Sequence, residues 1–168
     1  MKKLLFTTIA SVLMLFNVHA QNVAKECVLF EVFTGVNCPY CPAAAMAVGR
    51  LLEEGKAIAP VAFHTNAFSV PEFYTNETNQ RANYYYINSY PTMKVDGVKS
   101  PSVGGQSNNQ EYIDYSYNQA LTAYNQRINV TSPFELDLTF SWKSGTQFEV
   151  KATADKVGTC SSTDVRVF

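Results

Sequence analysis

The sequence predicts a mixed α/β domain followed by an antiparallel β region. Three observations carry this prediction. Short apolar runs typical of strands come first, and segments in which apolar residues recur at helical spacing alternate with them. Beyond Asn129 the period changes, and apolar and polar residues alternate one by one. We expect the order βαβαββα, followed by the start of a β-sandwich-like region.

The first twenty residues have the pattern of a cleavable secretory signal. Lys2 and Lys3 precede an apolar run that extends from Leu4 to Val18, and a small residue, Ala20, ends the segment. The run is short and broken by polar residues, which argues against a membrane span. We therefore expect an exported protein without a transmembrane span after signal removal. It would lie in the periplasm or be associated peripherally with the outer membrane.

Charge argues against a nucleic-acid partner. The chain has 13 basic and 14 acidic residues, and loss of the signal removes two lysines and no acid, which changes the formal charge from -1 to -3. No basic tract follows the signal, so no footprint for phosphates is present. All four cysteines follow the signal, so export would place them where disulfides persist; they are Cys27, Cys38, Cys41 and Cys160.

The first strand and helix form a βα unit. Val28 to Phe33 is almost continuously apolar, which is typical of a parallel strand buried on both faces. Pro39 to Glu54 carries one apolar helical stripe, and Gly55 is placed to end the helix. The stripe consists of Ala44, Val48, Leu51 and Leu52.

The next two elements are a strand and a weaker helix. Ile58 to Phe63 is a second apolar run, and Asn76 to Ile87 is the helical candidate. The order so far is βαβα.

Two short strands and a long helix complete the predicted domain. Thr92 to Val95 and Val98 to Ser100 flank Asp96-Gly97, a pair that accepts the positive φ of a hairpin turn. The helix extends from Ile113 to Ile128, with Asn108 or Asn109 as its cap. Between them, residues 104 to 110 form a polar loop to which the pattern assigns no specific function.

The C-terminal region predicts a hairpin with one buried face. Residues 134 to 142 and 148 to 154 alternate around a turn at Gly145, and Asp164 to Phe168 has the pattern of a third strand. Two or three strands rarely form a sandwich core alone, so we expect a truncated reading frame. The predicted divisions are a signal at 1–20, an α/β domain at 21–128 and an incomplete β-rich region at 129–168.

The segment Cys38-Pro39-Tyr40-Cys41 lies between the first strand and the first helix. A C-x-x-C pair at this junction is typical of a thioredoxin-like redox site, but it also suits an inert disulfide or a zinc ion. Zinc is the weakest of these alternatives because no second C-x-x-C or His pair is present. We therefore predict no metal and no cofactor.

A thiol at Cys38 would lie at a helix N-terminus. The unpaired backbone N–H groups and the helix dipole there stabilise a thiolate. A free thiol titrates near ~8.5, and thiols in such sites titrate between roughly 3.5 and 7.5. Cys38 is therefore the candidate nucleophile, and Cys41 would resolve the mixed disulfide.

Residues 28 to 128 resemble the thioredoxin-like superfamily. The resemblance rests on the C-x-x-C after the first strand and on Tyr90-Pro91-Thr92 before the third. It implies a cis-proline at Pro91 beside the dithiol, shaping the substrate groove. One departure is Asn37, since thioredoxins place a Trp immediately before the first cysteine.

A Bacteroidota family of thioredoxin-like, outer-membrane-associated proteins resembles the chain more closely. This likeness rests on Glu31 to Gly35, His64 to Asn66 and Tyr90 to Thr92. Such proteins carry a β-rich C-terminal portion, which the predicted hairpin would begin.

Two further residues are candidates for an auxiliary role at this site. His64 is the only histidine beyond the signal, and it could tune Cys38 or transfer protons; the alternative is a polar group that caps a strand end. Glu31 could accept the proton of Cys41, as an acid does in thioredoxins, or it could simply be hydrogen-bonded within the strand.

Two functions follow from these patterns. The first is thiol-disulfide exchange with protein thiols or disulfides, through Cys38 and Cys41. The second is a binding or surface-interaction protein that uses the fold as a scaffold, suggested by the Tyr-rich stretch at 84–86 and the β-rich region. Cys27 and Cys160 either pair with one another, or Cys27 is buried and the partner of Cys160 lies beyond this chain.

Overall fold

The computed structural model describes residues 22–162. It contains two compact units, one of which consists of Ala24–Ser132; the other includes the chain from Pro133 onward. The predicted signal at 1–20 and the predicted strand at 164–168 lie outside the described residues. The division of the chain into folding domains stays a prediction.

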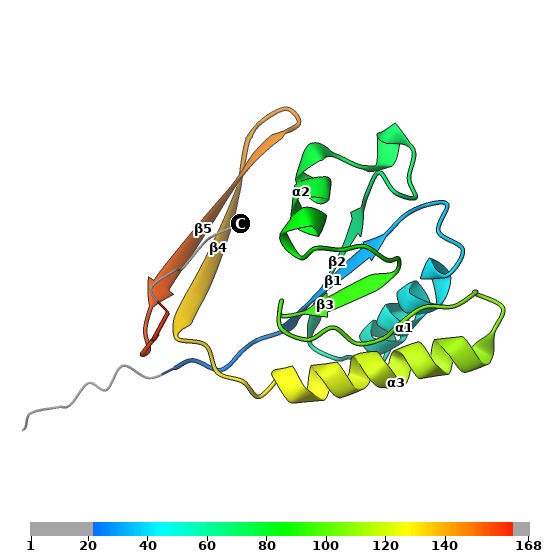
Figure 1. Cartoon of the computed structure of the whole chain (residues 1–168). Helices are drawn as coiled ribbons and strands as arrows, with labels where there is room; N and C mark the ends of the chain where they lie inside the picture. The colour runs from blue at the N-terminus through cyan, green and yellow to red at the C-terminus, as the bar shows by residue number, and fades with distance from the viewer. Residues whose placement is uncertain (1–21, 163–168) are drawn as a thin grey trace, which may run out of the picture. The chain divides into compact units, whose positions relative to one another are not determined.

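A three-stranded sheet forms the centre of the first unit (Figure 1). Strand β1 (Val28–Thr34) lies between β2 (Ile58–His64), which is parallel to it, and β3 (Thr92–Val95), which is antiparallel. Five of the seven β1 residues are buried, which confirms the prediction of a strand covered on both faces.

One face of this sheet packs against two helices, α1 (Cys41–Glu53) and α3 (Gln110–Arg127) (Figure 1). The Asn109 side chain caps α3 by accepting a hydrogen bond from the Tyr112 N–H. The main core lies between the sheet and these helices, and its apolar residues alternate along β1 as a two-residue period requires. They are Val28, Phe30, Val32, Ala47, Val48, Leu51, Met93, Val95, Tyr117, Ala120 and Ala123.

The opposite face of the sheet is covered by α2 (Asn76–Tyr84), which begins at a Thr75 capping box (Figure 1). A short 3-10 helix, η1 (Pro71–Phe73), precedes it. The Phe33 ring, from β1, stacks on Phe63 with centroids 5.2 Å apart. This face also holds Glu31, a buried charged residue described below.

The strand predicted at Val98 to Ser100 is wrong. Asp96 and Gly97 do adopt the positive φ values of 50° and 66° expected for the turn. However, Val98 and Lys99 both donate their backbone N–H groups to Val95, so the chain forms a single bridge and no ladder. The observed order is β1-α1-β2-α2-β3-α3, and this α/β arrangement is thioredoxin-like.

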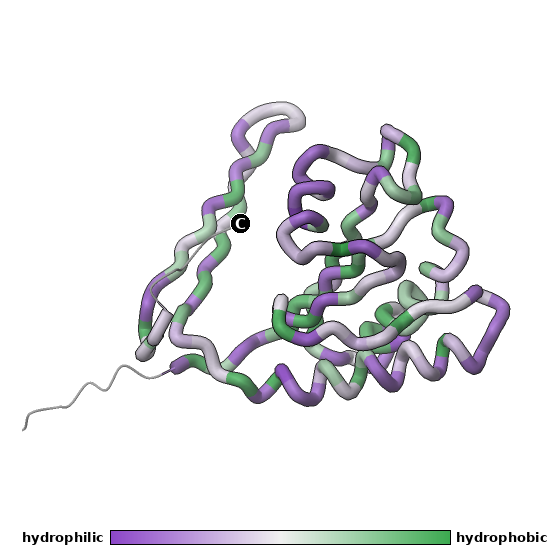
Figure 2. The backbone as a smooth tube through the Cα atoms, viewed as in Figure 1, coloured by the Kyte–Doolittle hydropathy of each residue, from purple (hydrophilic) through white to green (hydrophobic). Residues whose placement is uncertain are grey.

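The second unit contains an antiparallel hairpin of β4 (Phe134–Ser144) and β5 (Gln147–Lys156). Figure 2 shows the predicted alternation of apolar and polar residues along both strands. The prediction of a buried face is wrong, because two strands cannot cover their own apolar side. Six large side chains on it are between 56% and 74% exposed: Leu136, Leu138, Phe140, Trp142, Phe148 and Val150.

Within residues 22–162, none of the helices combines the length and the apolarity that crossing a membrane requires.

Candidate functional site: the Cys38–Cys41 disulfide

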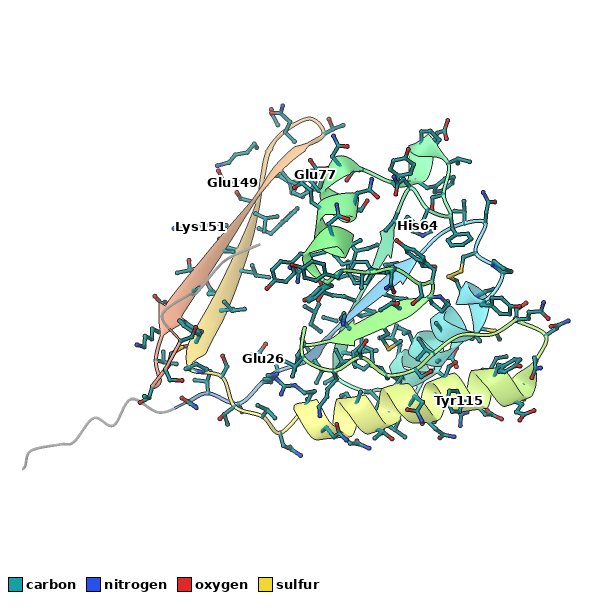
Figure 3. All side chains as sticks on the ribbon, in the orientation of Figure 1. Glu26, His64, Glu77, Tyr115, Glu149 and Lys151 are labelled. Carbon is teal, nitrogen blue, oxygen red and sulfur yellow. A yellow bond between two sulfur atoms is a disulfide. The ribbon has the colours of Figure 1, made fainter. Side chains whose placement is uncertain are left out.

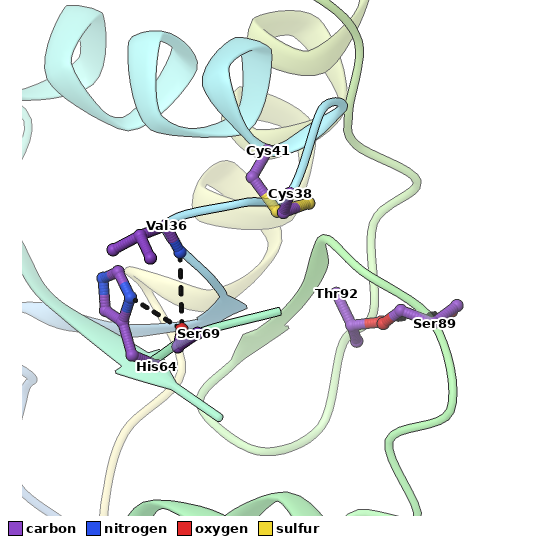
Figure 4. The surroundings of a disulfide bond; sticks show 7 residues. All are labelled: Val36, Cys38, Cys41, His64, Ser69, Ser89 and Thr92. Atoms are coloured by element: carbon purple, nitrogen blue, oxygen red, sulfur yellow. Dashed lines mark hydrogen bonds between the residues drawn. A yellow bond between two sulfur atoms is a disulfide. The ribbon is translucent and has the colours of Figure 1, made fainter. Parts of the chain in front are cut away.

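Cys38 and Cys41 form a disulfide at the start of α1, with their Cα atoms 5.5 Å apart (Figures 3 and 4). Cys38 lies in the loop that follows β1, and Cys41 is the first residue of the helix. Both residues are only 6% exposed. The sequence therefore places the pair at the strand-to-helix junction, as predicted, and the fold covers most of it.

A loop after β2 holds one side of the cysteine segment. The Asn37 N–H donates to the Phe68 carbonyl oxygen at 2.9 Å, and the Cys38 N–H donates to the Gly35 carbonyl oxygen at 3.1 Å. A Cβ atom at Gly35 would lie 2.5 Å from both the Cβ and the carbonyl oxygen of Phe68. Only glycine permits this approach of the two backbones.

A second loop, before α3, holds the other side. The Gly105 N–H donates to the Tyr40 carbonyl oxygen at 2.7 Å, and the Ala43 N–H donates to the Gly105 carbonyl oxygen at 3.0 Å. Gly104 and Gly105 have φ values of 131° and 147°, which favour glycine. This part of the polar loop therefore positions the cysteine segment, a structural task that its sequence pattern did not indicate.

The Tyr90–Pro91 peptide bond is cis. A Cβ atom at Gly104 would lie 2.9 Å from the Pro91 ring and 3.2 Å from the Tyr40 carbonyl oxygen. The loop that holds Gly104 therefore lies against both the loop that holds Pro91 and the cysteine segment, residues 38–41. The functional role predicted for Pro91 stays a prediction.

Exposed and half-buried apolar side chains lie on the cysteine segment and on the loops that contact it. The Phe68 and Tyr90 rings meet edge to face with centroids 5.5 Å apart, and Phe68 is 40% exposed. Val36 and Tyr40, which flank Cys38 in the sequence, are 44% and 56% exposed. We call these four residues and Pro91 the disulfide rim. Sequence reasoning missed Phe68, whose only signal is an aromatic residue in a turn-rich loop.

His64 lies at the end of β2 and contacts the cysteine loop indirectly. Its Nδ1 atom lies 3.4 Å from the Ser69 hydroxyl, which accepts a hydrogen bond from the Val36 N–H at 3.3 Å (Figure 4). Its ring also lies 6.2 Å from that of Phe73. His64 is therefore linked to the backbone two residues before Cys38, and its chemical role stays a prediction.

Glu31 is 2% exposed and has two partners from α2 and its end. Arg81 donates from Nε to one carboxylate oxygen at 2.7 Å, and the Tyr85 hydroxyl donates to the other at 2.8 Å. Burial and the Glu31 hydrogen bond raise the pKa of Tyr85 to about 12. The alternation along β1 places Glu31 with Phe33 on the α2 face, opposite α1, which begins at Cys41. Its predicted role as the acceptor of the Cys41 proton stays a prediction.

The other two cysteines are both free, so they do not form the bridge considered from the sequence. Cys27 is exposed, which contradicts the alternative in which it was buried. Among residues 22–162, no three His, Cys, Asp or Glu side chains gather where they could hold a metal ion.

The fold and the site define a thioredoxin-like protein with a C-x-x-C disulfide at the start of its first helix. No family model matches the sequence, and no curated protein matches it. One similar solved structure is HBP35 of Porphyromonas gingivalis, at 18% identity over 73% of this chain and 39% of that chain, with a TM-score of 0.48.

A second similar structure is the protein AGR_C_4864 of Agrobacterium tumefaciens. It is 16% identical over 76% of this chain and 57% of that chain, with a TM-score of 0.42. The present chain thus spans less than two thirds of the length of either protein.

Proposed function

We propose that this protein exchanges disulfides with protein thiols or disulfides through Cys38 and Cys41. The observation that carries the proposal is the disulfide at the start of α1, next to the loops that hold Pro91 and Gly104. A dithiol at a helix N-terminus is poised for exchange because the dipole stabilises the thiolate.

In the oxidised protein, a substrate thiolate attacks the Cys38 sulfur. The bond between Cys38 and Cys41 breaks, Cys41 leaves as a thiolate, and a mixed disulfide joins Cys38 to the substrate. A second substrate thiolate then attacks the substrate sulfur, so the substrate gains a disulfide and Cys38 leaves reduced. Two electrons pass from the substrate thiols to the protein disulfide. The reverse sequence reduces a substrate disulfide.

Single-cysteine variants test the proposal. Reduced Cys41→Ser should accumulate a mixed disulfide with a disulfide-containing protein substrate, because the Cys38 thiolate attacks the substrate disulfide, one substrate sulfur leaves as a thiolate, and no Cys41 thiol is present to resolve the mixed disulfide. Cys38→Ser should lack the insulin-reducing activity expected of the wild-type chain. The proposal fails if the wild-type chain has no exchange activity and its Cys38 thiol titrates near ~8.5 or above, as a free thiol does.

We include export in this proposal, with residence in the periplasm or peripheral association with the outer membrane. The support is the signal-like pattern of residues 1 to 20. Mass spectrometry of protein from the producing cell should find a mature chain that begins at Gln21, in the envelope fractions. An intact Met1 N-terminus in the cytoplasmic fraction would contradict it.

A second candidate function is a binding protein that uses the fold as a scaffold. The exposed apolar face of the β4–β5 hairpin favours it, since soluble proteins rarely leave large apolar patches uncovered. Under this alternative, a variant with Ser at both Cys38 and Cys41 should bind its partner as well as the wild-type chain does. Loss of binding in that variant would count against it.

A further inference from the structure

We infer that two copies of this chain associate through the apolar side of the β4–β5 hairpin and form a four-stranded sandwich, with the turn end of one hairpin over the open end of the other. This inference gives the second candidate function above a partner, a second copy, and it does not depend on disulfide exchange. Three features support it: the two-sided character of the hairpin, the area of its apolar side and the order of large and small side chains along it.

The hairpin has one apolar face and one charged face. Residues that are directly opposed in the register share a face. The opposed pairs on the apolar side are Leu136 with Ala154, Leu138 with Ala152, Phe140 with Val150, and Trp142 with Phe148. We call these eight residues the apolar hairpin face. On the other side, the Lys143 side chain pairs with Glu149 at 2.8 Å, so only the apolar hairpin face can be buried without removing charges from water.

The apolar hairpin face is large enough for a specific interface. All eight of its residues are exposed in a single copy, and the six large ones are between 56% and 74% exposed. Each of the six can bury roughly 100 Å² more, so two copies would remove about 1,200 Å² from water, above the roughly 1,000 Å² that a specific interface needs. Two strands rarely form a core alone, whereas two facing hairpins form both layers of a sandwich.

Side-chain size decreases along the apolar hairpin face from the turn end to the open end. At the turn end, the rings of Phe140, Trp142 and Phe148 contact one another, with centroids 5.3 to 6.0 Å apart. At the open end, Leu136 is paired with Ala154. Two such layers pack without voids only when the large side chains of one face the small side chains of the other.

A two-fold axis that runs across the strands meets this requirement. It places Trp142 opposite Leu136 of the second copy, and Phe148 opposite Ala154 of the second copy, and each contact occurs twice. An axis along the strands would instead place Trp142 opposite Phe148 at one end and Leu136 opposite Ala154 at the other, which leaves the open end unfilled. The order of side chains thus makes the face complementary to itself in the first arrangement.

A lipid surface is the other occupant that an exposed apolar face with a tryptophan suggests. Anionic membranes attract surfaces rich in Lys and Arg. Residues 134–156 contain four acidic residues and three basic ones, so the hairpin has no excess of positive charge. The charge of the hairpin therefore favours a second copy.

The test uses the full chain with Cys27→Ser and Cys160→Ser, because these two free thiols could join copies covalently. Trp142 is the only tryptophan of the sequence and is 68% exposed in a single copy, so its emission reports burial of the face. We expect sedimentation to show a dimer at about 100 μM that dissociates on dilution, with a red shift of the Trp142 emission. A monomer at about 100 μM would overturn the inference.

Two neighbouring residues on opposite faces of β4 locate the interface. Leu138→Glu would bury a carboxylate from each copy, so the dissociation constant should rise at least about hundredfold. Thr139→Glu is the matched control, since it adds the same charge to an exposed position on the charged face, and it should change the constant less than about threefold. Equal effects of the two substitutions would overturn the inference. Circular dichroism would establish that each variant is folded.

A size exchange tests the arrangement of the two copies. Ala154→Phe places a second ring opposite Phe148 of the second copy, so it should weaken association about tenfold. The double variant Phe148→Ala/Ala154→Phe exchanges the two facing side chains and should recover most of this loss. Stronger association of Ala154→Phe, or no recovery in the double variant, would overturn the turn-over-open-end packing.

The remaining outcomes separate this inference from the other proposals. If the chain sediments as a monomer and its Trp142 emission shifts to the blue only with phosphatidylcholine vesicles, the face binds lipid and the inference is wrong. Disulfide exchange with glutathione should be the same in Leu138→Glu as in the parent chain. Loss of exchange in both proteins would contradict the proposed exchange function and leave the dimer untouched.

Discussion

The two ends of strand β1 are built from different interactions. At its carboxyl end, the cysteine segment is held by backbone hydrogen bonds and close glycine contacts, in segments without charge. At its amino end, Asp96 accepts hydrogen bonds from the Lys25 side chain, from Arg127 Nε at 2.9 Å and from the Leu29 N–H at 3.0 Å. Ion pairs therefore hold the amino end of β1, whereas backbone hydrogen bonds and close glycine contacts hold the segment that follows its carboxyl end.

This difference matters for the chemistry of a thiol. Burial would raise the pKa of Asp96, but the hydrogen bonds from Lys25, Arg127 and the Leu29 N–H outweigh it and hold the pKa below its ordinary value. A comparable charge beside Cys38 would shift the pKa of that thiol and the stability of its disulfide. The segments that contact the disulfide, residues 32–49, 65–71, 82–93 and 100–110, contain no Asp, Glu, Lys or Arg, so the electrostatic influence that they supply to a Cys38 thiolate is the N-terminus of α1.

The largest expected effect tests the backbone fit at the disulfide end. In Gly35→Ala, the new Cβ would lie 2.5 Å from the Phe68 backbone, so the Phe68 loop must move and its hydrogen bond to Asn37 must lengthen. We expect a loss of about 3 kcal/mol in the free energy of unfolding. Urea denaturation of the oxidised protein, followed by circular dichroism, measures it.

Gly49→Ala is the matched control. Gly49 lies inside α1, and an added Cβ meets no atom within 4 Å. Alanine is the better helix former, so this variant should gain about 0.5 to 1 kcal/mol. If both substitutions changed stability equally, the contact between Gly35 and Phe68 would not constrain the fold.

The next effect concerns the buried charge in the middle of β1. Arg81→Met leaves the Glu31 carboxylate 2% exposed without its guanidinium, and we expect a loss of about 3 kcal/mol. Arg50→Met is the control, since the Arg50, Glu54 and Asp114 side chains are all 35% to 49% exposed, and it should lose less than about 1 kcal/mol. The double variant Glu31→Gln/Arg81→Met should recover part of the lost free energy of unfolding, because it removes the unpaired charge. If the double variant recovers nothing, an unpaired Glu31 charge is not the cause of the loss.

Local sequence patterns predicted the elements that hold the disulfide. The apolar run that begins at Val28 and the helical stripe that includes Ala44 predicted the bounds of β1 and α1 to within a few residues. Local patterns suffice here because the buried face of a strand or helix repeats at a fixed spacing along the sequence. The Asp96-Gly97 turn was also predicted, but its second strand was not formed. A turn residue indicates the φ value that its own position requires, but it does not indicate whether the residues after it pair with the preceding strand.

The contacts between distant segments could not be predicted. The Phe68 ring contacts the Tyr90 ring, and the Gly105 N–H donates to the Tyr40 carbonyl oxygen. The residues of each pair are far apart in the sequence, and hydrophobic periodicity describes only neighbouring residues. The partners of Glu31 are Arg81 in α2 and Tyr85, the residue that follows α2, which lie 50 and 54 residues further along the chain. Its charge was visible in the sequence, whereas the face of the sheet on which it lies depends on the packing of α2.

A smaller effect is expected at the charged end of β1. Because the folded pKa of Asp96 is lowered, its contribution to stability is present above the unfolded pKa of ~3.9 and is lost as the pH falls through the folded value. Asp96→Asn should therefore cost about 1.5 kcal/mol at neutral pH and flatten the acid limb of the stability profile. Exchange with glutathione at pH 7 should be unchanged, and a changed rate would show that the two ends are coupled.

The smallest effect is expected at alkaline pH and separates Tyr85 from the disulfide end. The pKa of Tyr85 is about 12 in the folded protein, above the ordinary value of 10.0, so the stability it contributes is complete below pH 10 and is lost as the pH rises towards 12. Tyr85→Phe removes the titrating hydroxyl and one hydrogen bond to Glu31, so it should cost about 1 kcal/mol at pH 8 and less at pH 11. The difference is measured from urea midpoints of two proteins, Cys38→Ser/Cys41→Ser with and without Tyr85→Phe. Both lack the Cys38 and Cys41 thiols, so no alkaline disulfide exchange between these two residues can occur. A constant cost across this range would mean that the Tyr85 hydroxyl does not titrate differently in the folded and unfolded chains.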